Sequence, residues 1–122
     1  MRFRYATVAL LIAVFATAPG AQTETVYKPG DGVTLPVLIK RVTAKYTSEA
    51  MQQRIEGTVR LDTVVNSDGH VGEVTVVKSL DSVYGLDNEA VKAVKQFEFK
   101  AGTKDGKPVA VRVTIEVTFT LK

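Results

Sequence analysis

The chain contains no cysteine and no tryptophan, and it has a single histidine, His70. Without cysteine it can form neither a disulfide nor a thiolate metal site, and it offers no Cys for a lipid anchor. His70 follows a predicted turn with no serine or cysteine nucleophile expected nearby, and no pair of acidic residues has metal-ligand or acid/base spacing. The sequence therefore does not indicate an enzyme, and we expect no catalytic residue, metal or cofactor.

An excess of one charge is also missing. The chain has 16 Lys and Arg against 13 Asp and Glu, and two of the basic residues, Arg2 and Arg4, lie in a segment that we expect to be removed. The remainder is nearly neutral, with no basic stripe for nucleic acid and no basic amphipathic helix for a lipid surface. Nucleic acid is therefore not an expected partner.

Long apolar runs are absent except at the N-terminus, where Arg2 and Arg4 precede a neutral apolar stretch over residues 5–18. Pro19 and Gly20 end this stretch after fourteen residues, short of the ~20 that a spanning helix needs. We predict a secretory signal peptide over residues 1–21, with a retained membrane anchor as the alternative. Cleavage would leave no membrane span, a flexible lead-in over residues 22–34, and one domain over residues 35–122.

The domain shows alternating helix and strand patterns. Thr47 precedes a short predicted helix over residues 48–54, and residues 55–66 and 71–79 read as two strands joined by a tight turn. A second helix begins near Leu86, with Asp87 as its expected cap, and a polar turn leads to the last strand. This order predicts an α+β two-layer sandwich, with a three-stranded antiparallel sheet and two helices on one face.

The last strand is the strongest pattern in the sequence. Every odd position from Val109 to Leu121 is apolar, and the even positions are small, polar or charged. Side chains of a strand alternate between its two faces, so the odd set can lie on the core and the even set on the opposite face. A strand this long exceeds the usual ~5 to 6 residues, so we expect part of its backbone edge to stay unpaired and open to another strand.

An ordered set of short sequences resembles the C-terminal domain of TonB family proteins. The set comprises Glu56-Gly57-Thr58-Val59-Arg60-Leu61, Ser67-Asp68-Gly69-His70-Val71, Leu86-Asp87, Phe97-Glu98-Phe99, and Asp105-Gly106-Lys107-Pro108-Val109 through Leu121. The resemblance implies a periplasmic domain that binds the TonB box, a short extended segment of outer-membrane receptors, as a strand beside its own last strand. The residues expected to form this peptide-binding edge are Val111, Arg112, Val113, Thr114, Ile115, Glu116, Val117 and Thr118.

Full energy transducers of this family also have an N-terminal anchor that engages the ExbB and ExbD motor, followed by a long Pro-rich span. Here about a dozen residues separate the predicted leader from the domain. Fully extended, these residues reach at most ~45 Å. We therefore expect a periplasmic protein-binding module without the anchor and linker, which captures segments of outer-membrane transport proteins. The alternative is a self-associating module, such as a homodimer, that uses the same sheet edge.

Overall fold

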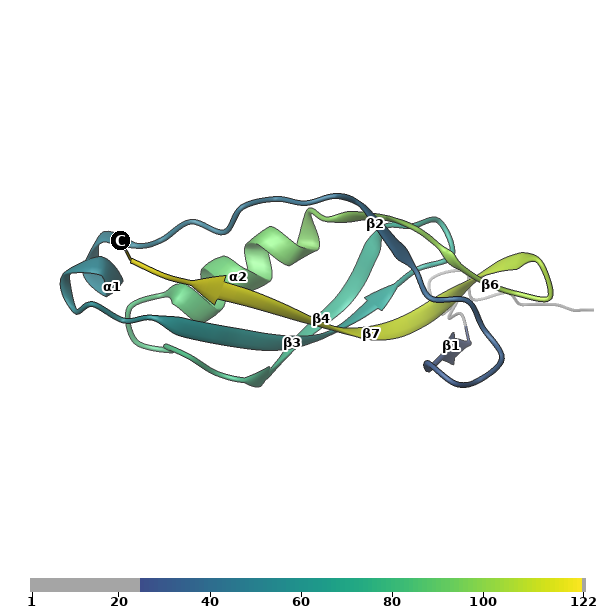
Figure 1. Cartoon of the computed structure of the whole chain (residues 1–122), viewed down its shortest axis with the longest axis horizontal. Coiled ribbons are helices and arrows are strands. Elements are labelled where there is room, and N and C mark those ends of the chain that lie inside the picture. Colours follow the sequence, from purple (N-terminus) through teal and green to yellow (C-terminus); the bar gives the residue numbers. More distant parts are fainter. Residues whose placement is uncertain (1–24, 122) are drawn as a thin grey trace, which may run out of the picture.

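The computed structural model describes residues 25–121, so the predicted signal peptide lies outside the described residues. The fold is an elongated α+β domain, with α1 at one end and the β6 hairpin and β1 at the other (Figure 1). Its elements are β1 (Val26–Tyr27), β2 (Val37–Lys40), α1 (Ser48–Gln52), β3 (Gly57–Val65), β4 (Val71–Lys78), α2 (Leu86–Lys95), β5 (Glu98–Lys100), β6 (Gly102–Lys104) and β7 (Lys107–Phe119).

The main sheet has the strand order β1-β7-β3-β4, and β6 pairs with β7 in addition. The antiparallel trio β7-β3-β4 is the three-stranded sheet that the sequence predicts. The structure adds β1, which runs parallel to β7, and a separate ribbon in which β2 pairs with β5. These additional pairings involve strands of two to four residues, too short for an alternating pattern to be recognised in the sequence.

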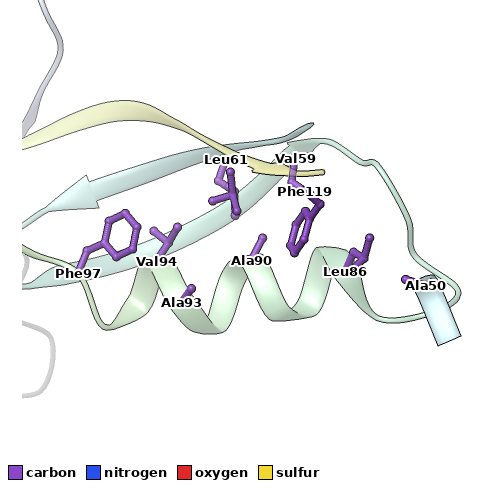
Figure 2. Packing of buried hydrophobic residues seen from close by; sticks show 10 residues of the cluster. Ala50, Val59, Leu61, Leu86, Ala90, Ala93, Val94, Phe97 and Phe119 are labelled. Atoms are coloured by element: carbon purple, nitrogen blue, oxygen red, sulfur yellow. The ribbon is translucent and has the colours of Figure 1, made fainter. Parts of the chain in front are cut away.

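The core lies between the sheet and the helices. Figure 2 shows the apolar stripe of α2, from Leu86 through Ala90 and Val94, directed at the strands, with Leu61 of β3 over Ala90 and Val94 and Ala50 of α1 past the Leu86 end. All five of these residues are fully buried. At roughly 1.5–3 kcal/mol for each large side chain removed from water, this packing holds α2 on one face of the sheet and α1 at the Leu86 end of α2.

The first helix begins as the sequence predicts. Thr47 is the N-cap of α1, and its hydroxyl oxygen accepts a hydrogen bond from the Ala50 N–H. The same hydroxyl donates to the Tyr84 carbonyl oxygen at 2.8 Å, in the loop that precedes α2. One side chain therefore caps α1 and ties it to the start of the second helix.

The start of α2 differs from the prediction, which made Asp87 its cap. The N-cap position is Gly85, which has φ of 98° and no side chain to donate or accept a bond. Asp81, in the preceding loop, accepts from the Leu86 N–H at 3.2 Å and so takes the expected role of Asp87. Asp87 points back instead and accepts from the N–H groups of Leu80 and Asp81, both at 3.0 Å. The reason is that the loop folds back over the helix start, which a linear capping pattern does not encode.

The lead-in has more regular structure than the flexible segment that we expected for residues 22–34. Within its described part, Tyr27 of β1 pairs with Val111, and the Lys104 ammonium lies 5.2 Å from the Tyr27 ring centre. Thr34 pairs through its hydroxyl with the Thr103 hydroxyl at 2.9 Å. The β6–β7 hairpin therefore holds this segment in place.

Candidate functional site

The candidate site is the edge of β7 that faces away from β3. On one side, β7 pairs with β3 in an unbroken antiparallel register from Val111 opposite Val65 to Phe119 opposite Gly57. On the other side, the partner within residues 25–121 is β1, which is beside Ala110 and Val111 alone. The edge is therefore open beyond Val111.

The register determines which backbone groups point to this open edge. The Asn66 N–H donates to the His70 carbonyl oxygen, toward β4. Because successive strand residues direct these groups to alternate sides, those of Val65 point to β7 and bond to Val111. Odd-numbered residues of β7 therefore bond to β3, and even-numbered residues direct their N–H and C=O groups to the open edge. These residues are Arg112, Thr114, Glu116 and Thr118.

The β6–β7 hairpin supports the same assignment. Its two-residue turn, Asp105 and Gly106, has φ values of 52° and 79°, as a type I′ turn requires. Such a turn is closed by a hydrogen-bonded pair, here Lys104 and Lys107, so odd-numbered residues of β7 also bond to β6. The strand β6 thus lies on the same side of β7 as β3, and it leaves the opposite edge uncovered.

The even-numbered side chains form a polar row on the face turned away from the helices. Glu116 accepts from Arg60 of β3 at 3.1 Å, and the Thr114 hydroxyl donates to Asp62 at 3.3 Å. Arg112 lies 3.8 Å from Glu73 of β4. These exposed pairs each contribute little to stability, at most ~1 kcal/mol. They nevertheless fix the positions of one basic and one acidic side chain, Arg112 and Glu116, along the edge.

A hollow of about 330 Å³ lies beside the far end of this edge. It is bounded by the segment 41–46 on one side and by Thr118 and Phe119 on the other. Tyr46 packs edge-on against Phe119 with ring centres 5.4 Å apart, and its hydroxyl donates to the Ile55 carbonyl oxygen. Partial burial, then the nearby Glu56 carboxylate, raises the pKa of Tyr46 despite the opposing effect of Arg54, so Tyr46 is neutral at physiological pH.

Comparison with known proteins identifies the family. The sequence model described as "Gram-negative bacterial TonB protein C-terminal" matches residues 42–121. The chain belongs to the TonB C-terminal domain family. This match covers all of β3, β4, α2 and β7 and, apart from Arg41, the residues that line the hollow.

Curated relatives and a solved structure agree with this assignment. The chain is 32% identical over 91 residues to "Protein TonB" of Vibrio cholerae, covering 74% of this chain and 37% of the relative. It is 35% identical over 77 residues to "Protein TonB" of Xanthomonas campestris pv. campestris, covering 63% of this chain and 34% of the relative. The chain thus spans about a third of the length of these relatives. The solution NMR structure of the Pseudomonas aeruginosa TonB CTD has the same fold, with a TM-score of 0.58 and 23% identity over 78% of this chain and 93% of that one.

In this TonB C-terminal domain, the predicted edge residues differ in exposure: Arg112, Val113 and Ile115 are half-buried, and Thr118 is exposed. Thr114 and Glu116 have their side chains exposed, whereas Val111 and Val117 are buried in the core. Val111 also lies beside β1, so the open stretch begins at Arg112. The sequence does not predict where the segment 41–46 lies, because its position depends on contacts across the fold. The one signal is the aromatic Tyr46 before the predicted helix.

The acidic residues and the histidine lie at separate places. Asp62 contacts Thr114, Asp105 is in the hairpin turn, and Asp68 accepts a hydrogen bond from the His70 N–H. Within residues 25–121, no three His, Cys, Asp or Glu side chains are grouped so that they could hold a metal ion. In the same residues, no helix has the length and apolar character needed to cross a membrane.

Proposed function

We propose that this domain captures extended peptide segments of outer-membrane transport proteins by adding them as a strand beside β7. The observation that supports this is the row of backbone N–H and C=O groups at Arg112, Thr114, Glu116 and Thr118, which no strand among residues 25–121 pairs. Main-chain bonds of this kind supply affinity in strand addition, and side chains on alternate faces supply selectivity.

Selectivity would come from two different surroundings. Side chains of the added strand that point to the helix side would meet the hollow beside Tyr46 and Phe119. Those on the opposite face would meet the polar row that includes Arg112 and Glu116. We therefore expect segments that resemble a TonB box, with apolar side chains alternating with polar ones.

The proposal places the protein in the periplasm, where the predicted signal peptide would deliver it. Names of the relatives support a role in TonB-dependent energy transduction. Because the resemblance concerns their C-terminal third, we propose binding of the receptor segment as the activity of this chain, with no catalysis and no cofactor.

The test is an amide NMR titration of the mature protein with peptides taken from the N-termini of outer-membrane receptors. We expect the amide signals of Arg112, Thr114, Glu116 and Thr118 to shift. We also expect the amide protons of these four residues to exchange more slowly with peptide than without it. A scrambled peptide of the same composition is the control. Saturating peptide without shifts along β7 would contradict the proposal.

Self-association through the same edge is the second candidate function. It is favoured by the length of the open stretch, because two such edges can pair with each other as readily as with a peptide. A dilution series recorded before the titration separates the two, since shifts on dilution along β7 without a peptide effect would identify an assembly module.

A further inference from the structure

The ribbon formed by β2 and β5 presents apolar side chains to solvent. Leu35, Val37 and Ile39 are 54%, 59% and 68% exposed. Three large apolar residues so close together on a surface call for an explanation, because scattered single residues are the norm. This ribbon lies outside the main sheet, and β2 pairs with β5 and not with β7.

The register of the ribbon shows which side faces outward. Leu38 is opposite Phe99, which packs against the core cluster, so their shared face is turned toward the core, although Leu38 itself remains 39% exposed. Val37 is opposite Lys100 and Lys40 is opposite Glu98, so these four side chains share the outer face. Ile39 lies at the register irregularity between Leu38 and Lys40, where a bulge turns it outward.

Lysine side chains lie beside this apolar strand. Lys40, Lys95 and His70 line a hollow of about 430 Å³ together with Glu98, the one acidic residue there. Lys40, Lys95 and Lys100 are all exposed, and none of the three forms an ion pair with any residue of 25–121. Apolar side chains among unpaired lysines, with Glu98 as the one carboxylate, thus form one surface. We call it the ribbon surface and define it by Leu35, Val37, Ile39, Lys40, Lys95, Glu98 and Lys100.

We infer that the ribbon surface docks on an anionic lipid bilayer. Val37 and Ile39 would enter the boundary between head groups and acyl chains, as the apolar face of an interfacial element does. Lys40 and Lys95 would receive a lipid phosphate in the hollow beside His70, with their apolar stems along the bilayer surface. The positive charge of the lysines is complementary to the negative charge of an anionic bilayer. A second copy of the protein would bring the same lysines and is therefore the poorer partner.

The sequence does not predict this surface, because it lacks a basic amphipathic helix. The required pattern is built instead from two strands that are almost sixty residues apart, and the lysine of α2 comes from a third element. The inference is independent of peptide capture at β7, so either can fail without the other.

The test is co-sedimentation of the mature protein with vesicles, after mass spectrometry has established its N-terminus. We expect binding to vesicles of phosphatidylglycerol and phosphatidylethanolamine and none to phosphatidylcholine alone. The double variant Lys40→Glu/Lys100→Glu should lower the partition coefficient at least about tenfold. The matched control, Lys45→Glu/Lys78→Glu, has the same net charge and should bind like the unmodified protein.

A second pair of variants tests the apolar contribution. Ile39→Ser should weaken vesicle binding, whereas Val83→Ser should not, although Val83 is the more exposed residue at 78%. Thermal melting of each variant establishes that it folds. The inference is overturned if the unmodified protein ignores anionic vesicles, if both charge variants lose binding equally, or if Ile39→Ser abolishes a dimer seen by sedimentation while vesicles have no effect. A last readout is the NMR signal of the His70 ring with vesicles and with inorganic phosphate. The inference is also overturned if inorganic phosphate alone shifts this signal as vesicles do, since the hollow would then be an anion site without a lipid role.

Discussion

Two aspartates with different partners hold the loop before α2. Asp81 is buried and accepts from the N–H groups of Val83, Tyr84 and Leu86. Asp87 accepts from the N–H groups of Leu80 and Asp81 and from the Ser79 hydroxyl. The pair closes the loop from both sides, so the start of α2 depends on tertiary hydrogen bonds more than on a local cap.

Replacing Asp87 with alanine should lower the free energy of unfolding by about 1–3 kcal/mol, because two backbone donors lose their acceptor. The measurement is urea denaturation followed by circular dichroism. Asn88→Ala, at an exposed neighbouring position of the same helix, is the control and should change stability by less than about 0.5 kcal/mol. Equal effects of the two substitutions would show that the hydrogen bonds of Asp87 do not stabilise the loop.

The same residue should make stability depend on pH in acid. Partial burial raises the pKa of Asp87, but the hydrogen bonds from Asp81, Ser79 and Leu80 outweigh it and hold the pKa below its usual value. Its charged form therefore stabilises the fold above the unfolded pKa of about 4, and this contribution is lost as the pH falls through the lower folded pKa. Asp87→Asn should flatten the fall in melting temperature below about pH 4. An unchanged acid profile would contradict this assignment.

Gly69 occupies a position that no side chain fits. It has φ of 87°, and a Cβ would lie 2.2 Å from the Phe99 carbonyl oxygen. Gly69→Ala should therefore cost about 2–4 kcal/mol, as overlap adds to backbone strain. Gly106→Ala separates the two effects. Gly106 has φ of 79°, but a Cβ added there would have no atom within 4 Å apart from those of its chain neighbours, so this substitution should cost only about 1–2 kcal/mol. Thermal melting of both variants provides the comparison.

At the scale of single elements, β7 permits a test of its two edges by proline. Glu116→Pro removes an N–H that points to the open edge, so it should abolish peptide binding and leave a folded domain. Ile115→Pro removes an N–H bonded to β3 and should cost about 3 kcal/mol or more. Peptide titration and melting of each variant give the two readings.

Two further variants control for the side chains that these prolines remove. Glu116→Ala keeps the backbone N–H and loses only the exposed pair with Arg60, so peptide binding should persist. Ile115→Ala keeps the ladder to β3 and isolates the lost packing. Peptide binding by Glu116→Pro equal to that of Glu116→Ala would overturn the assignment of the open edge.

The elements that the sequence predicts are those whose period extends over many residues. β7 has 13 residues, and its predicted bounds differ by two residues at each end; α2 has ten residues and begins at Leu86, as predicted. β5 and β6 have three residues each, and the sequence predicts no strand there, only a polar turn before the last strand. The cap of α2 was missed because Asp81 reaches it through a loop, and β1 was missed because its partner is eighty-four residues away.

At the scale of the whole molecule, the α+β architecture follows from the sequence, because each amphipathic helix has to bury its stripe against the sheet. The candidate edge was predicted from the excess length of the last strand. The hollow beside it was not, since it requires the segment 41–46 to pass along β7 on its way to α1. A contact between distant segments leaves no periodic trace in the chain.

The oligomeric state is the property of the whole molecule that decides between the two candidate functions. We expect the mature protein to remain monomeric on dilution from about 1 mM to 10 μM, because capture of a peptide requires the edge of β7 to stay free. Sedimentation equilibrium measures this directly, and Arg112→Glu serves as the control because it changes the charge pattern without removing a backbone group. A monomer–dimer equilibrium in this range would favour the assembly module.

The parallel pairing of β1 with β7 has a consequence for the size of what can be recognised. Tyr27 lies beside Val111, and the chain then turns away at Lys28, where the backbone N–H donates to Asp31. An added strand would therefore meet a fixed stop at one end, and the open stretch that it could pair with runs from Arg112 to Thr118, about 20 Å. The described part of the lead-in would thus set the point where pairing begins, and a segment of about seven residues would fill the open stretch.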